Sequence, residues 1–481
     1  MIMTNSHDST KKWWALVVLC LGTLMIVLDT TIVNVALPSI KKDLGFSDVS
    51  LAWVVNAYML TFGGFLLLSG RLGDLFGHRK LFLIGLVLFT LASLACGLSP
   101  TQGLLVTARA VQGLAGAIVS AVSLSLMMGL FYEPVERAKA MGIFGFVAAG
   151  GGSIGVLLGG VLTGALNWHW IFLVNIPVGI LVIIMSLSLL PKAHKESEHK
   201  HLDVAGAVTI TTALMIAVYA IVNGNVFGWT SQKALGLLAL SIILIISFLI
   251  IESRVRVPLM PLRIIKLRNV ATSDIIGVLW AAAMFASFFL SALYMQLVLN
   301  YSPLKVGLAF LPSNLIMATF SIGLSAKLVM KFGIKKTLSI GLSLAAISLL
   351  LLARVPVDGN FMVDILPPMI LLGIGAGMAF NPMLLAAMSD VSQNESGLAS
   401  GLVNTSFMMG GALGLAILAS IAASRTTALI SSGHNLLASL TSGYHSAFLV
   451  GAISAALGAT LAATLLREPK SAPQNQVQHM G

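Results

Sequence analysis

Charged side chains are scarce in this chain. Asp, Glu, Lys and Arg make up only 9% of its 481 residues, whereas soluble globular proteins carry about 25%. Apolar residues account for 57%. This balance excludes a protein built mainly of soluble domains. It predicts an all-α polytopic membrane protein, because only helices and closed barrels span a bilayer.

Cysteine is nearly absent, which excludes a disulfide framework and a cysteine metal site. The two cysteines, Cys20 and Cys96, both lie in long apolar runs. Three histidines in a polar linker lack the short spacing on a fixed element that closes a metal site, so we expect no metal there. They are His194, His199 and His201.

Other classes of protein are excluded by missing motifs. The chain has no Gly-x-x-x-x-Gly-Lys-Ser/Thr loop for ATP-driven transport. No nucleophile–base or paired-acid arrangement suggests a membrane-embedded enzyme. A channel would show a ring-forming filter and fewer glycine-rich spans. We therefore expect a transporter rather than an enzyme.

Long apolar runs dominate what is present. The chain has fourteen predicted spans, and an even number puts both termini on the same side of the membrane. The distribution of basic residues between the two sides then indicates which side is cytoplasmic, by the positive-inside rule. Of the 28 Lys and Arg residues, 21 fall on the side of the termini, 6 on the opposite side and one, Arg109, inside a span. This predicts cytoplasmic termini and explains the net charge of +11 without nucleic acid as a partner. The fourteen predicted spans are 13–36, 50–70, 80–98, 101–128, 138–163, 169–190, 204–223, 234–252, 270–297, 305–330, 336–354, 364–388, 397–424 and 444–466.

A polar linker divides the chain. It runs from 191 to 201 and is rich in Lys, Glu, Ser and His. We expect an N-terminal six-helix bundle at 1–190, a linker with two extra spans at 191–268, a C-terminal six-helix bundle at 269–466 and a short tail at 467–481. The first apolar run lacks a small-residue cleavage site, so we expect it to be retained as a span.

One carboxylate lies inside the first span. Asp29 precedes Pro38 by nine residues, and Arg109 follows Thr101 by eight in the fourth span. At a rise of ~1.5 Å per residue, both lie about 12–14 Å below the same membrane face. A charge at membrane depth costs at least about 2.5–3.5 kcal/mol, so it needs a partner or a watery cavity. We predict that the two side chains pair, either as a functional site or as a fixed ion pair between two helices.

The loop from Gly70 to Lys80 carries three glycines, Gly70, Gly73 and Gly77, that allow a tight turn. Asp74 and Arg79 flank that turn. A carboxylate there can bond a neighbouring helix terminus or an arginine, which predicts a conformational latch. The alternative is a loop that only orients the protein in the membrane.

Further candidates carry weaker signals. Asp274, some five residues into the ninth span, is either a second functional acid or an interfacial residue. A substrate pocket needs apolar and aromatic walls with a few polar groups, although each such residue could equally serve packing or face lipid. The candidates are Asn34, Trp53, Asn56, Tyr58, Gln112, Trp280, Phe285, Tyr294, Gln296, Asn314 and Asn381.

Several motifs together resemble the major facilitator superfamily, and within it the fourteen-span drug:proton antiporter family. The segment 70–80 resembles its loop between spans two and three, and Arg109–Gly113 its fourth-span motif. The segment 28–38 is similar to the first-span motif, and Gly150–Gly160 to the antiporter motif. Further matches lie at 168–177, 201–206, 397–401 and 410–414. The chain departs from the pattern at Val156, where proline is usual, and at His169, where arginine is usual.

The resemblance implies a major facilitator fold of two six-helix bundles plus two extra central spans, with alternating access to a midplane cavity. It implies proton-coupled export of drugs or other amphipathic or cationic compounds across the cytoplasmic (inner) membrane of a bacterium. Asp29 would exchange a proton for a cation, with Arg109 as the counter-charge. The antiporter motif would supply Gly151, Gly155, Gly159 and Gly160.

The remaining expectations concern partners and substrate. We expect small-molecule substrates, protons and the lipid bilayer as partners, and no cofactor beyond the proton gradient. A monomer is expected, and no periplasmic adaptor is indicated. The alternative function is export of a physiological metabolite, such as an amino acid, a siderophore or a lipid-like molecule, with incidental drug efflux.

Overall fold

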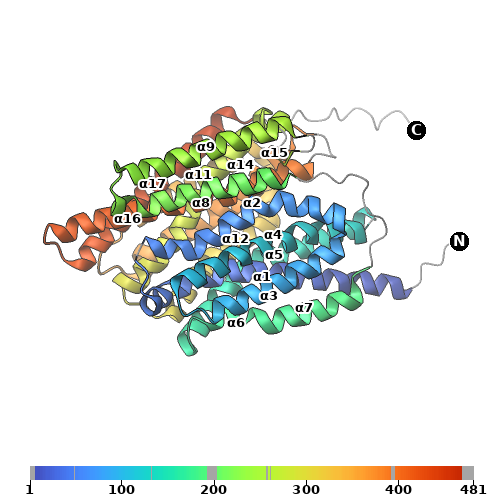
Figure 1. Ribbon diagram of the computed structural model, residues 1–481, viewed down its shortest axis with the longest axis horizontal. Coiled ribbons are helices and arrows are strands. Elements are labelled where there is room, and N and C mark those ends of the chain that lie inside the picture. The colour runs from blue at the N-terminus through green and yellow to red at the C-terminus, as the bar shows by residue number, and fades with distance from the viewer. Residues whose placement is uncertain are drawn as a thin grey trace.

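A computed structural model describes residues 6–47, 49–131, 133–191, 203–255, 258–259, 262–391 and 396–467. Within these ranges the regular structure is helical, as predicted, and the long helices lie side by side along one direction (Figure 1). The three linker histidines and nearly all of the predicted tail fall outside the described residues.

The first part of the chain forms six long helices and two short elements. A 3₁₀ turn, η1, precedes α2, and a single helical turn, α6, precedes α7. The bounds are α1 Ser6–Leu44, η1 Ser50–Ala52, α2 Trp53–Phe76, α3 His78–Gly97, α4 Gln102–Leu130, α5 Pro134–Ala165, α6 Trp170–Leu173 and α7 Asn175–Leu189.

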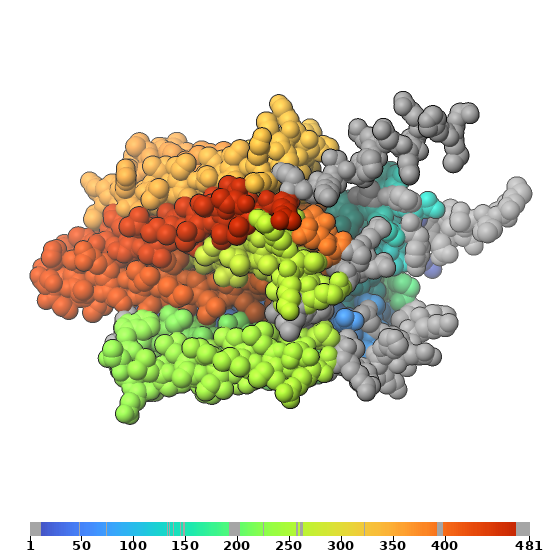
Figure 2. Space-filling model, turned by 90° about the horizontal axis from the view of Figure 1, so that it is seen from above, coloured from blue at the N-terminus to red at the C-terminus, as the bar shows by residue number. Residues whose placement is uncertain are grey.

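The second part continues with further long helices, three of them joined to π-helical turns. The bounds are α8 Val204–Phe227, α9 Gln232–Arg254, α10 Leu262–Ile265, α11 Arg268–Leu293, η2 Tyr294–Val298, α12 Pro303–Thr319, η3 Phe320–Leu324, α13 Ser325–Phe332, α14 Ile334–Leu352, η4 Phe361–Ile365, α15 Leu366–Met388, α16 Ser396–Ser431 and α17 Leu436–Leu465. In Figure 2, α8 and α9 (green) lie along one edge of the face, beside the red hairpin of α16 and α17.

The described residues contain twelve helical segments long and apolar enough to cross a membrane. The chain is therefore a multi-pass membrane protein, but the predicted number of fourteen spans is not confirmed. The two remaining segments contain α5 and α12–α13. In each of them some side chains lie outside the described residues, at 145, 148 and 149 in α5 and at 322 in η3, so twelve is a count for the described residues alone.

Several predicted helix ends are wrong. The first helix continues through Pro38 to Leu44, because a membrane helix tolerates the loss of one backbone hydrogen bond. The loop expected between 424 and 444 shrinks to residues 432–435, and the α16–α17 hairpin projects beyond the other helices (Figure 1). Hydropathy detects apolar turns but not the polar turns that continue a helix. We call the side of the molecule on which the α16–α17 hairpin projects the hairpin end.

Glycines bring α5 close to its neighbours. A Cβ on Gly155 would lie 2.0 Å from the Thr31 hydroxyl of α1, and one on Gly159 would lie 2.6 Å from the Ile32 carbonyl. A Cβ on Gly160 would lie 2.8 Å from the carbonyl of Pro303 in α12. Small residues allow such close approach of helices in a membrane. The glycine motif thus holds α5 between α1 and α12.

Substitution of Gly159 tests this packing. In Gly159→Ala the new methyl group must displace α1, and we expect a loss of about 1–3 kcal/mol, as for overpacked cores. Gly150→Ala is the matched control, because a Cβ there meets nothing within 4 Å. Melting temperatures of the purified proteins in detergent measure both. Equal melting temperatures for the two variants would contradict the close contact.

Candidate functional site

The structure brings Asp29 of α1 and Arg109 of α4 together. Arg109 Nη1 donates to Asp29 Oδ2 at 2.5 Å, and the side chain of Arg109 is 1% exposed and that of Asp29 0%. The two charges that were predicted at the same depth, Asp29 and Arg109, are therefore in contact. Whether the pair couples transport or only ties two helices remains a prediction.

Amide groups complete the surroundings of the carboxylate. Gln112 Nε2 donates to Asp29 Oδ1 at 2.7 Å, and Asn175 Nδ2 donates to the same oxygen at 3.1 Å. Gln112 also accepts from Arg109 Nη1 at 2.6 Å and donates to Ser93 at 2.8 Å. These five residues form one hydrogen-bonded cluster from α1, α3, α4 and α7, which we call the Asp29 cluster.

Aromatic rings and backbone hold the arginine in place. The Arg109 guanidinium lies 4.4 Å from the centre of the Tyr58 ring and 5.7 Å from that of Phe172. Its Nε donates to the Val54 carbonyl at 2.9 Å. Cation–π contacts of this kind strengthen when water is excluded. A Cβ on Gly113 would lie 2.2 Å from the Tyr58 carbonyl, so α2 and α4 touch beside the cluster.

The chemistry of the cluster follows from its charges. The carboxylate has one cation and two amide donors and is closed to water. If Asp29 binds a proton, Arg109 becomes a buried charge without a counter-charge, which is costly. A cation that approaches Asp29 competes with Arg109 for the same oxygens. A change of charge at Asp29 therefore requires rearrangement of the helices that hold the cluster.

Two members of the cluster were not predicted. Asn175 carried a detectable signal, because it is an amide inside the apolar run 169–190. Ser93 carried none, since a serine in a helix can bond its own backbone.

The predicted latch is only partly described. Gly77 separates α2 from α3 with a φ of +88°, a conformation that favours glycine. Arg79 donates to the Leu187 carbonyl at 2.5 Å. Gly73 packs against the His78 ring, whereas Gly70 has open space around it. The side chain of Asp74 lies outside the described residues, so the latch stays a prediction.

The second acid, Asp274, lies on α11 away from the Asp29 cluster. It lies near Ser406 of α16, and its Oδ1 is buried without a hydrogen-bond partner. The structure therefore places Asp274 where α11 and α16 pack.

The predicted pocket residues come from several helices, and whether they form a pocket stays a prediction. Tyr58 and Gln112 contact Arg109, as described above. Gln296 donates to the Val35 carbonyl at 2.8 Å, Tyr294 to the Pro356 carbonyl at 2.6 Å, and Asn381 to the Ser321 carbonyl at 2.8 Å.

Within the described residues the other pocket candidates form no side-chain hydrogen bond to another helix, although some of them pack in the apolar core. Asn34 reaches a carbonyl in its own helix, at 3.5 Å. Trp53 and Phe285 are half-buried against the apolar core. Buried polar atoms without a hydrogen-bond partner belong to Asn56, Trp280 and Asn314.

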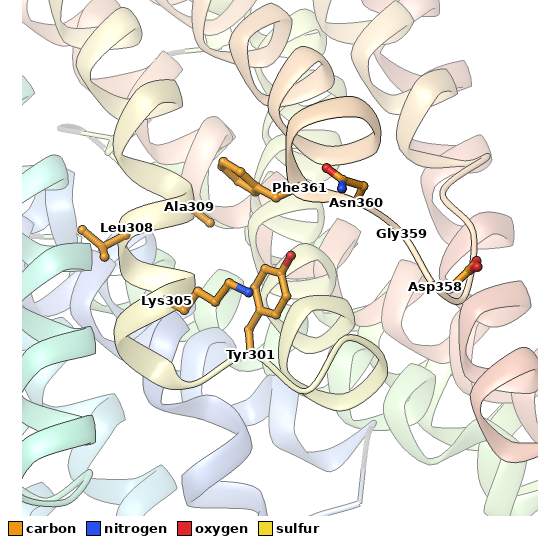
Figure 3. Close-up of a pocket in the computed structure, with 8 residues that line it drawn as sticks. All are labelled: Tyr301, Lys305, Leu308, Ala309, Asp358, Gly359, Asn360 and Phe361. Carbon is orange, nitrogen blue, oxygen red and sulfur yellow. The ribbon is translucent and has the colours of Figure 1, made fainter.

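A cavity of about 430 Å³ opens near the start of α12 (Figure 3). Lys305 lies over the ring of Tyr301, with Nζ 3.5 Å from its centre. The opposite wall comes from Asp358–Phe361. None of the predicted pocket residues lines this cavity.

Comparisons with known proteins agree on the family. Residues 19–415 match the model of the Major Facilitator Superfamily. The chain is 37% identical to the puromycin resistance protein of Streptomyces alboniger, over 95% of this chain and 90% of that one. It is 35% identical to the cephamycin export protein of Amycolatopsis lactamdurans, over 86% and 85%. It is 33% identical to the multidrug resistance protein Stp of Mycobacterium tuberculosis, over 85% and 76%.

Solved structures share the fold. The chain superimposes on the human organic anion transporter MFSD10 with a TM-score of 0.62 and 16% identity, covering 94% of this chain and 99% of that one. For the inward-open xylose transporter of E. coli the TM-score is 0.61 and the identity 15%, covering 96% and 97%.

The buried pair makes a specific prediction about stability. Arg109→Gln leaves the Asp29 charge without a cation, and we expect a loss of about 3–5 kcal/mol. The double variant Asp29→Asn/Arg109→Gln removes both charges and should recover part of this loss. The melting temperatures of wild type and of these variants, measured in detergent, test both expectations. The exposed Arg71→Gln is the control and should change stability by less than about 0.5 kcal/mol. A double variant no more stable than Arg109→Gln would contradict the charge imbalance.

Proposed function

The chain belongs to the Major Facilitator Superfamily, and on this basis we propose that it is a proton-coupled antiporter that exports drugs or other amphipathic, cationic compounds from the cytoplasm. The observation that carries the proposal is the fully buried carboxylate of Asp29, balanced by a single arginine. The similarity to resistance and export proteins supports export as the direction. The protein is proposed as a transporter without enzymatic activity or cofactor.

Competition at Asp29 would couple the two fluxes. A cationic substrate from the cytoplasm binds best when Asp29 is charged. A proton arriving from the opposite side neutralises Asp29 and expels the cation. Once the proton leaves toward the cytoplasm, Arg109 again compensates the carboxylate. Proton and substrate thus occupy the site in turn, which is the requirement for antiport.

Contacts between the two halves support alternating access. We assign α1–α7 to an N-terminal bundle (1–190), α8 and α9 to the extra segment (191–268), and α11–α17 to a C-terminal bundle (269–466). The hydrogen bond from Gln296 to the Val35 carbonyl joins the two bundles near the hairpin end. Release of substrate at that end requires this contact to break.

We propose that α5 and the α12–α13 segment also cross the membrane, which gives fourteen spans. The 32 residues of α5 would reach across the roughly 30 Å hydrocarbon core. Its close contact with α1, a spanning helix, supports this proposal. With the basic residues concentrated on the side of the termini, both termini would be cytoplasmic, in the inner membrane of a bacterium.

A second candidate is the export of one natural product. The names of several relatives each specify a single compound, among them puromycin, cephamycin and tetracenomycin C. Buried polar atoms without partners, on Asn56, Trp280 and Asn314, would suit a substrate with matching hydrogen-bonding groups. A metabolite such as an amino acid, a siderophore or a lipid-like molecule is the corresponding physiological cargo.

Efflux from intact cells tests the carboxylate. We expect wild-type cells to export puromycin and a fluorescent lipophilic cation, and a protonophore to abolish that export. Asp29→Asn should fall to the level of cells without the protein, because a neutral amide cannot exchange a proton for a cation. Asp358→Asn, an exposed acid outside the cluster, is the control and should export normally. Full export by Asp29→Asn would move the coupling acid elsewhere, with Asp274→Asn tested next.

Cysteine labelling tests the fourteen spans. Single cysteines replace Glu133 and Asn167 at the two ends of α5, and Ser302 and Lys336 around α12–α13. With a membrane-impermeant maleimide on intact cells, we expect labelling at 167 and 302 only. Labelling of both members of either pair from the same side would contradict that crossing.

A further inference from the structure

A second cavity, of about 470 Å³, lies at the hairpin end between α14, α16 and α17. Its polar wall contains Arg354 just after α14, Arg425 on α16, and Ser442 and Ser446 on α17. Arg425 Nε donates to Ser442 Oγ at 3.4 Å. His445 bonds the Val355 carbonyl at 2.8 Å and so fixes α17 against the end of α14.

Positive charge in this cavity is not balanced by the protein. Both arginines are exposed, and among the described residues neither forms an ion pair with a carboxylate. No acidic side chain lines the cavity. Asp358, only four residues beyond Arg354, lines the other cavity instead (Figure 3). Two guanidinium groups with hydroxyls beside them are suited to a phosphate, since arginine binds phosphate oxygens with paired N–H groups.

Apolar side chains continue from the cavity along the same helices. Leu350 and Leu449 are part of its wall. Ile347, one turn back on α14, and Ile453, one turn further on α17, extend the surface. These four side chains are between 42% and 53% exposed. In a membrane protein such a ridge faces lipid tails. The cavity therefore has a cationic head region that adjoins an apolar ridge.

We propose that this cavity binds an anionic phospholipid. Its phosphate lies between Arg354 and Arg425 and accepts hydrogen bonds from the serine hydroxyls, while an acyl chain follows the apolar ridge on α14 and α17. A free phosphate would leave the apolar ridge unmatched. A zwitterionic lipid would bring an ammonium group into a cavity that has no acid to meet it. Charge complementarity and the apolar ridge together select a lipid with net negative charge.

Native mass spectrometry of the full chain in neutral detergent measures this binding. The probes are phosphatidylglycerol, phosphatidylcholine with the same acyl chains, and inorganic phosphate. The test variant is Arg354→Gln/Arg425→Gln. The matched control, Lys233→Gln/Lys305→Gln, removes two positive charges from the same end of the molecule but none from this cavity.

We expect wild type to retain phosphatidylglycerol in preference to phosphatidylcholine. At about 1 kcal/mol for each basic residue, the test variant should bind phosphatidylglycerol about thirty-fold more weakly, and each single variant about fivefold. The control should bind like wild type. Equal weakening in test and control variants would show that only the general charge of this end matters and would overturn the site. If inorganic phosphate binds as tightly as phosphatidylglycerol, the cavity is a site for free anions, and the lipid proposal is overturned.

Discussion

The neutralisation of one carboxylate inside the membrane is the constraint on which the N-terminal half depends. Asp29 is fully buried and is held by Arg109, Gln112 and Asn175. Because an unpaired charge there would be costly, the helices that carry these partners must stay in contact. Glycines add a further close neighbour to α1: Gly155 and its neighbours place α5 against it, although α5 carries none of these partners. The cluster therefore fixes how the helices around it pack.

The position of Asp29 on α1 suggests how charge can affect access. All three of its partners belong to the N-terminal bundle, so the pair does not itself bridge the two halves. Six residues further along the same helix, the Val35 carbonyl accepts a hydrogen bond from Gln296 of the other bundle. A shift of α1 that accommodates a protonated Asp29 would therefore act directly on a contact between bundles. The helix α1 alone would then connect Asp29 to this contact, and no longer chain of interactions is required.

The sequence predicts the helical fold and the central pair because both follow from strong local signals. Asp29 and Arg109 are the charges deepest in apolar runs, and helical rise places them at one depth. Other features depend on information absent from hydropathy. Ser93 looks like any helical serine, Pro38 does not end its helix, and α16 continues as polar turns to Ser431. Fourteen spans were expected, and within the described residues twelve helical segments meet length and hydropathy together.

The competition of proton and cation for Asp29 is tested most directly by proton release. Purified protein in lightly buffered detergent solution is mixed with a lipophilic cation that it transports, at a pH where part of the population is protonated, and the pH change is recorded. Substrate binding should release protons from wild type and none from Asp29→Asn. Equal release from both proteins, or saturable binding to wild type without any release, would contradict competition at this carboxylate.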